Sequence, residues 1–91
     1  MMAAALLIER IIKEQELIIG PLAWREAKKV KGLAVTSSGA IKVAGSGKKV
    51  LGDLVGQYEK LFGPASRDVC REAVKALIPQ ASKNDIPEVL R

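Results

Sequence analysis

Histidine is absent from this chain of 91 residues, and cysteine occurs only once, at Cys70. The absence of histidine removes the commonest general base and the commonest metal ligand. A single cysteine cannot form an internal disulfide, and its place among apolar residues predicts a buried, unreactive thiol in a reducing environment. We therefore expect a protein that holds no metal or other cofactor and that is not an enzyme.

Aromatic residues are scarce as well, since Trp24, Tyr58 and Phe62 are the only ones. The core must therefore be built mainly from alanine, valine, leucine and isoleucine, a composition that suits helix packing. No apolar run reaches the roughly 20 residues of a membrane span, and the N-terminus lacks the basic leader of a secretory signal. We expect one small domain with a modest core, located in the cytoplasm and without a membrane partner.

The first third of the chain has the apolar spacing of two helices. From Ala3 to Ile19, apolar residues recur at helical spacing with charged residues between them, and the start of this segment is apolar on nearly all sides. Gly20 and Pro21 then end this helix and begin the next, which we expect to run from Pro21 to about Lys31. The apolar positions of the first helix are Leu7, Ile8, Ile11, Ile12, Ile18 and Ile19.

The second half of the chain predicts another pair of helices. Ser46 is a typical N-cap residue, and the helix after it has an almost complete apolar face. Gly63 and Pro64 again separate two helices, and we expect the last one to end at about Ile78, because Pro79 cannot continue it. Residues 80–91 form a polar tail whose apolar end either docks as a short turn or stays loose. The apolar face of the third helix comprises Val50, Leu51, Leu54, Val55, Tyr58, Leu61 and Phe62.

Between the two helix pairs, two short β-branched runs are separated by Ser-Ser-Gly at 37–39, a pattern typical of a β-hairpin. Loop length decides which residues pair. A two-residue loop would place Val35 opposite Lys42 and mix apolar with charged side chains on one face. A three-residue loop gives one apolar face, and it puts Gly39 where the turn requires a left-handed backbone, so we predict this register. Its apolar pairs are Val35 with Ile41 and Leu33 with Val43.

These elements predict an α+β fold in the order ααββαα, with four helices around a central two-stranded antiparallel hairpin. Residues 1–79 make up the single domain. When Gly20-Pro21 is aligned with Gly63-Pro64, apolar residues of the two helix pairs coincide at an offset of 43 residues. Two explanations remain open: a duplicated helix-Gly-Pro-helix unit, or two unrelated amphipathic pairs joined by the same stop-and-restart dipeptide. The fold prediction holds for both.

The segment 45–49 has the small residues and the lysines of a phosphate-binding loop. The pattern G-x-x-x-x-G-K-[ST], however, requires a glycine where Lys42 stands and a hydroxyl where Lys49 stands, which excludes a nucleotide-binding loop of that kind. Free N–H groups at a helix start still attract anions, so Ser46 and Gly47 form a candidate anion nest. The alternative is that the glycines only turn the chain and Ser46 only caps the helix.

Basic residues are concentrated in the centre of the sequence. Between Arg25 and Lys49, seven basic residues stand against one acidic residue, Glu26. Such a concentration attracts polyanions, which makes nucleic acid a candidate partner, although no aromatic residues for base stacking are interleaved with it. The alternative is a solvated lysine face without a ligand. The seven residues are Arg25, Lys28, Lys29, Lys31, Lys42, Lys48 and Lys49.

Several features of the sequence predict self-association. The apolar start of the first helix exceeds what one partner face requires, and a two-stranded hairpin has unpaired edges. Gly52 and Gly56 each cost about 1 kcal/mol relative to alanine in a helix, so we expect the hairpin, another helix or a second copy to approach them closely. Our interpretation is a small non-enzymatic interaction or regulatory module that forms a homodimer and whose other protein partner the sequence does not identify. The alternative function is nucleic-acid binding through the basic centre.

Overall fold

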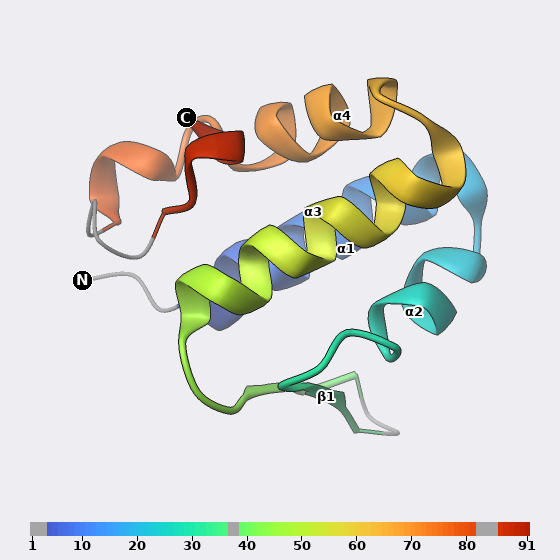
Figure 1. The fold of residues 1–91 in the computed structure, drawn as a ribbon, viewed down its shortest axis with the longest axis horizontal. Coiled ribbons are helices and arrows are strands. Elements are labelled where there is room, and N and C mark those ends of the chain that lie inside the picture. Colours follow the sequence, from blue (N-terminus) through green and yellow to red (C-terminus); the bar gives the residue numbers. More distant parts are fainter. Residues whose placement is uncertain (1–3, 37–38, 82–85) are drawn as a thin grey trace.

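The computed structural model describes residues 4–36, 39–81 and 86–91. Within these residues the predicted order ααββαα and the α+β fold are confirmed, and two short 3-10 turns follow. Helices α1 and α3 form a central pair, with α4 on one side of it and α2 and the hairpin on the opposite side (Figure 1). The elements are α1 (Ala4–Ile19), α2 (Leu22–Ala27), β1 (Leu33–Val35), β2 (Ile41–Val43), α3 (Gly47–Phe62), α4 (Ala65–Val74), η1 (Ile78–Gln80) and η3 (Glu88–Leu90).

The inner faces of α1 and α3 supply most of the core. Four of the six apolar positions whose helical spacing predicts α1 are fully buried, whereas Ile18 is exposed and Ile19 is partly buried. The apolar start of α1 packs largely against other parts of the same chain. Ala4 contacts the start of α3 so closely that a Cβ atom on Gly47 would lie 2.6 Å from the Ala4 Cβ. Leu6 alone among the described large apolar residues stays exposed at this end of α1.

Helix α2 is shorter than predicted, because it ends at Ala27 and not near Lys31. After residue 28, the amides of Lys29, Val30 and Leu33 bond to carbonyls three residues earlier, which makes tight turns in place of a helix. The chain then enters β1 through Gly32, whose φ is +87°. This glycine lies against the hairpin, since a Cβ atom there would be 2.8 Å from the carbonyl oxygen of Ala44. The turn into the hairpin therefore ends the helix early.

Helix α4 is also shorter than predicted and ends at Val74, four residues before Ile78. The Leu77 amide bonds to the Val74 carbonyl at 2.8 Å, and η1 follows. A proline disfavours α-helical backbone at the residue before it, so Pro79 favours the tighter 3-10 conformation here. These turns bring Leu77 and Ile78 partly against the core.

The hairpin has the predicted register, with a three-residue loop. Its pairs are Leu33 with Val43, Ala34 with Lys42, and Val35 with Ile41. The amide of Thr36 donates to the Ala40 carbonyl at 2.9 Å and closes the loop, and Gly39 has the expected positive φ of +87°. Loop residues 37 and 38 lie outside the described residues. Leu33 is buried and the apolar face contacts α1 through β2, whereas the other face is mostly exposed.

The two helix pairs are packed alike. Every buried residue of α1 has a buried counterpart 43 positions later in α3, and one of these pairs is polar, Gln15 and Tyr58. Gln15 Nε2 donates to the Ser66 carbonyl at 3.3 Å, and the Tyr58 hydroxyl donates to the Ala23 carbonyl at 2.7 Å. Ala23 and Ser66 are also 43 positions apart, so the helix pairs exchange equivalent contacts across an internal twofold axis. That the pairs arose by duplication stays a prediction.

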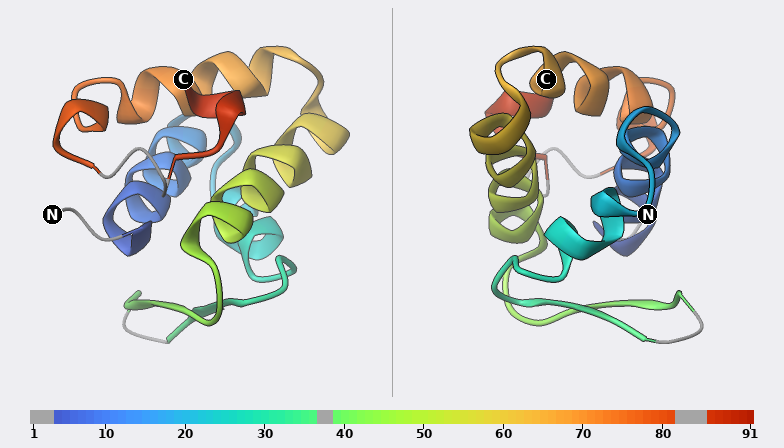
Figure 2. Two further views of the ribbon diagram at one scale, coloured as in Figure 1. Left: turned by 60° about the vertical axis from the view of Figure 1, so that its left-hand side comes forward. Right: turned by 90° about the vertical axis from the view of Figure 1, so that its right-hand side faces the viewer.

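Figure 2 shows this relationship in the arrangement of the helices, with α1 and α3 on two facing sides of the core and α2 and α4 on the other two. The matching positions are Leu7, Ile8, Ile11, Ile12 and Gln15 in α1, and Val50, Leu51, Leu54, Val55 and Tyr58 in α3.

The C-terminal segment contributes to the core. Ile86 and Leu90 are fully buried, and η3 contacts both α4 and α3. Pro87 lies beside Gly52, where an added Cβ atom would make an ordinary contact at 3.7 Å, while Gly56 faces open space. Within the described part of the chain, neither the hairpin nor another helix therefore approaches Gly52 and Gly56 closely, and approach by a second copy stays a prediction. Within α3, the glycine that another element approaches closely is Gly47, which lies against Ala4.

Candidate interaction surfaces

The structure separates the seven basic residues of the centre into two groups. Lys29 is paired with Glu26 at 3.0 Å, and Lys49 is paired with Asp53 at 2.9 Å. Within residues 4–36, 39–81 and 86–91, the other five make no ion pair. They are Arg25, Lys28, Lys31, Lys42 and Lys48, all of them exposed.

These five side chains come from neighbouring segments. Arg25 belongs to α2, Lys28 and Lys31 follow it, Lys42 is on the outward face of the hairpin, and Lys48 is in the first turn of α3. All of these segments lie in the lower half of the molecule in Figure 1. That these segments together form a basic patch stays a prediction.

A small recess has one of these five residues, Lys28, in its lining. It has a volume of about 200 Å³ and is lined by Trp24, Lys28, Val35, Thr36 and Gly39. Trp24 is half-buried and packs against the core, so only part of its ring remains available to a ligand. The sequence does not reveal this recess, because it depends on how the hairpin folds against α2.

The candidate anion nest at the start of α3 has a structural role. The Ser46 hydroxyl accepts a hydrogen bond from the Lys49 amide at 3.3 Å, which confirms the predicted N-cap. Gly47 has no room for a side chain because of Ala4, so its glycine is explained by packing. Anion binding by Ser46 and Gly47 stays a prediction.

Glu26 is a buried carboxylate, and its position within a basic segment of the sequence does not indicate this burial. Its side chain is 7% exposed and accepts hydrogen bonds from Lys29 Nζ at 3.0 Å and from Gln57 Nε2 at 2.9 Å. The hydrogen bond from Lys29, and to a smaller extent that from Gln57, lowers the pKa of Glu26 below its ordinary value. Glu26 thereby ties α2 to α3 and offsets part of the positive charge beside it. In the sequence, the ion pair of Glu26 and Lys29 is indicated only by their spacing of three residues, which makes them neighbours on a helix.

Cys70 and Gln15 form a buried polar contact without the features of a reactive site. Gln15 Nε2 lies 3.4 Å from the Cys70 sulfur, and burial raises the pKa of the Cys70 thiol to about 11. At neutral pH the thiol is therefore protonated and shielded from solvent, as the sequence predicts for an inert cysteine. The described residues contain no group of three or more potential metal ligands.

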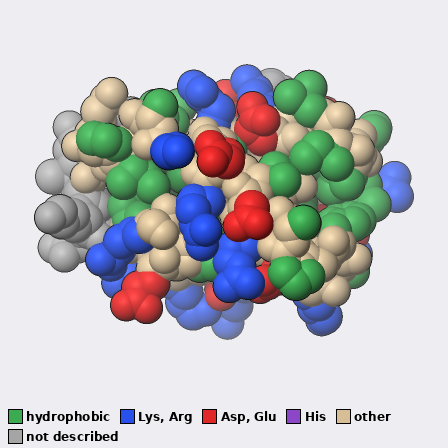
Figure 3. All heavy atoms as spheres, turned by 90° about the horizontal axis from the view of Figure 1, so that it is seen from above, with side chains coloured by type: hydrophobic (Ala, Val, Ile, Leu, Met, Phe, Trp, Pro, Cys, Tyr) green, Lys and Arg blue, Asp and Glu red, His purple; other side chains and the backbone are tan. Residues whose placement is uncertain are grey.

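Of the five exposed large apolar side chains among the described residues, four lie where α1 and α3 end. Leu17 is 81% exposed, Ile18 63%, Leu61 48% and Phe62 37%. Both helices end on the right in Figure 1, and hydrophobic side chains gather at that end in the view from above in Figure 3. We call these four residues the apolar end. Their helical spacing predicts buried positions for Ile18, Leu61 and Phe62, so this surface does not follow from the sequence.

Comparison of the chain with protein families, curated proteins and solved structures finds no match. Among the described helices, none combines the length and the hydrophobicity needed to cross a membrane.

Proposed function

We propose that this protein is a non-enzymatic interaction module that associates with a second copy of itself through the apolar end. The observation that carries the proposal is the exposure of Leu17, Ile18, Leu61 and Phe62 at the shared end of two helices. Single exposed apolar residues are common on soluble proteins, whereas several large ones at one end of a small molecule are typical of an interface. Covering these side chains would stabilise a complex by about 25 cal/mol for each Å² of apolar surface that is removed from water.

The internal twofold arrangement favours a second copy as the occupant. Ile18 corresponds to Leu61 at the offset of 43 residues, so each helix pair places an exposed apolar side chain at the end of its first helix. The counterpart of Leu17 is Lys60, and that of Phe62 is the partly buried Ile19. A twofold interface requires a surface that is complementary to itself. Exposed apolar side chains at equivalent positions of the two helix pairs meet this requirement more readily than an irregular surface does.

The hairpin is a less favourable dimer surface, although its edges are unpaired. Its outward face carries small residues and the exposed Lys42. Pairing of equivalent strands from two copies would bring like charges near each other, and lysine on an edge is a common protection against such pairing. We therefore assign the interface to the apolar end.

The mass in solution tests the proposal. At about 100 μM protein, well above the Kd of a micromolar interface, light scattering should give twice the chain mass of 9.8 kDa. A mass of 9.8 kDa at that concentration would contradict it.

Polyanion binding is the second candidate, and the five basic side chains without ion pairs support it. Replacing Lys28, Lys31, Lys42 and Lys48 by glutamine should abolish binding to duplex DNA, since all four are exposed. The matched control replaces four basic residues on other surfaces, with the same change in net charge; these are Arg10, Lys13, Lys60 and Lys75.

Salt dependence checks whether such binding uses phosphate contacts. The logarithmic slope is about −0.9 per neutralised phosphate, so four contacts predict a loss of roughly two orders of magnitude in affinity between about 50 and 200 mM salt. Equal losses in the two quadruple variants, or no binding in low salt, would remove nucleic acid as a partner.

A further inference from the structure

A pocket of about 530 Å³ lies between the C-terminal end of α4, η1 and η3. Its apolar lining is formed by Ile78, Pro79, Ile86 and Leu90. The volume lies within the range of small-molecule sites, about 300–1,000 Å³. A lining of this kind accommodates the apolar body of a ligand and offers few partners to polar groups.

Charged side chains line the same pocket. Three are cationic, Arg71, Lys75 and Arg91, and one is anionic, Glu72. Glu72 and Lys75 are 3.9 Å apart and both are largely exposed, so they offset each other in solvent. Arg71 also pairs with Asp68 at 3.5 Å, but Asp68 does not line the pocket. Cationic side chains therefore outnumber anionic ones in the lining, which favours a negatively charged group on a ligand.

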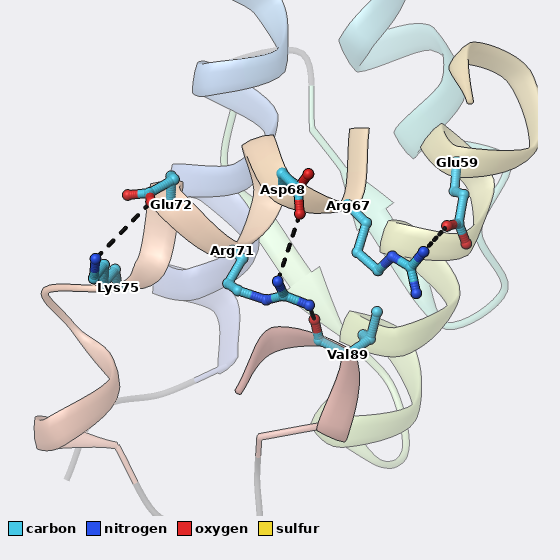
Figure 4. A network of polar contacts seen from close by, with 7 residues as sticks. All are labelled: Glu59, Arg67, Asp68, Arg71, Glu72, Lys75 and Val89. Atoms are coloured by element: carbon cyan, nitrogen blue, oxygen red, sulfur yellow. Dashed lines mark hydrogen bonds and ion pairs between the residues drawn. The ribbon is translucent and has the colours of Figure 1, made fainter. Parts of the chain in front are cut away.

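Arg71 is the cation best placed to hold such a group. Figure 4 shows its guanidinium extending from α4 toward Val89 in η3. Nη1 donates to Asp68 at 3.5 Å and Nη2 to the Val89 carbonyl at 3.3 Å, while the buried Nε has no acceptor within the described residues. Both bonds are longer than the roughly 2.7–2.9 Å of a strong charge-assisted hydrogen bond, so Arg71 can form better ones with a ligand.

The internal twofold arrangement places a cation at the equivalent position of the first helix pair. Arg71 corresponds to Lys28 at the offset of 43 residues, and Ile78 corresponds to Val35. Lys28 and Val35 line the smaller recess of about 200 Å³. A basic residue beside an apolar recess is thus common to both pairs, and the larger recess is the C-terminal one.

We propose that the C-terminal pocket binds an amphipathic carboxylate, with its apolar body on the pocket lining and its carboxylate at Arg71. A carboxylate matches the fork of N–H donors of a guanidinium. This proposal is independent of self-association through the apolar end, since the pocket uses none of the residues of that surface.

Amide chemical shifts of the ¹⁵N-labelled chain test the proposal during titration with sodium octanoate, N-acetyl-leucine and octanol. A carboxylate probe should cause saturable shifts at the end of α4 and in η3, and octanol should bind about tenfold more weakly than octanoate. Tighter binding of octanoate identifies a free acyl chain as the source of the carboxylate. Tighter binding of N-acetyl-leucine identifies the C-terminal residue of a polypeptide.

Substitution of Arg71 by methionine should weaken octanoate binding about tenfold and leave octanol binding unchanged. Arg67→Met is the matched control, since Arg67 is on the same helix, pairs with Glu59 at 3.2 Å and does not line the pocket. No saturable shift up to about 5 mM carboxylate, shifts confined to other surfaces, or equal binding of octanol would each overturn the proposal. The comparison of octanoate with octanol on the unsubstituted chain decides the question even if the Arg71 variant does not fold.

Discussion

Gln15 and Tyr58 make equivalent contacts in opposite directions across the core. Gln15 reaches from α1 to the Ser66 carbonyl of α4, and Tyr58 reaches from α3 to the Ala23 carbonyl of α2. Each side chain ties the first helix of one pair to the second helix of the other. The two helix pairs are thereby held together by polar contacts as well as by apolar burial.

Tyr58→Phe tests the stability contributed by this contact. The substitution removes the 2.7 Å hydrogen bond to Ala23 and keeps the ring in the core, so the free energy of unfolding should fall by about 1 kcal/mol. Urea denaturation followed by circular dichroism measures it. An unchanged unfolding midpoint for Tyr58→Phe would show that the bond contributes no net stability.

Alanine substitutions at Gly47 and Gly56 should have opposite effects, although both residues are in α3. Gly56→Ala gains helix propensity in open space and should stabilise the protein by roughly 1 kcal/mol. Gly47→Ala should destabilise it, because the added methyl group would lie 2.6 Å from the Ala4 Cβ atom. Thermal denaturation of the two variants checks the contrast. Stabilisation by both would mean that α1 and α3 are not in contact at their N-terminal ends.

Gly39→Val tests the hairpin loop. Gly39 has a φ of +87° and no described atom within 4 Å of an added Cβ, so any loss of stability comes from backbone strain and not from a clash. A β-branched residue fits this conformation poorly, and we expect a cost of more than about 1 kcal/mol. An unchanged melting temperature would show that the loop conformation is wrong.

Glu26 predicts a dependence of stability on pH. Its pKa is lower in the folded protein than the ordinary 4.5, chiefly because of the Lys29 hydrogen bond and then that from Gln57. The stabilisation is therefore fully present above the unfolded pKa and is lost as the pH falls through the folded pKa. The melting temperature should fall in this acidic range, and Glu26→Gln should reduce the fall. Identical pH profiles for the two proteins would rule out this contribution.

The local structure of the hairpin was predictable because it depends on neighbouring residues. Alternation of apolar and polar side chains distinguishes the two loop lengths, and Gly39 fits only one of them. The Ser46 cap was predictable for the same reason, since the capping hydroxyl bonds to an amide three residues later. The offset of 43 residues matches Ile12 with Val55, which are both buried, but it equally matches Ile18 with Leu61, which are both exposed.

Features that depend on distant contacts were not predictable. Helix α2 ends early because Gly32 packs against Ala44, a contact between segments on the two sides of the hairpin. Ile86 and Leu90 fill part of the core from a largely polar segment, and nothing in their spacing shows which helices they contact. The apolar end was missed because an apolar residue at helical spacing is expected to be buried, whereas Ile18 and Leu61 extend beyond the facing helices.

The location of the dimer interface tests the central proposal most directly. Sedimentation equilibrium would compare the unsubstituted chain with Leu17→Glu/Leu61→Glu and with a matched control, Leu6→Glu, at the opposite end of α1. We predict a dimer for the unsubstituted chain and for the control, and a monomer of 9.8 kDa for the double variant with an unchanged circular dichroism spectrum. A dimer that survives the double substitution, or a monomer for all three proteins, would contradict self-association through the apolar end.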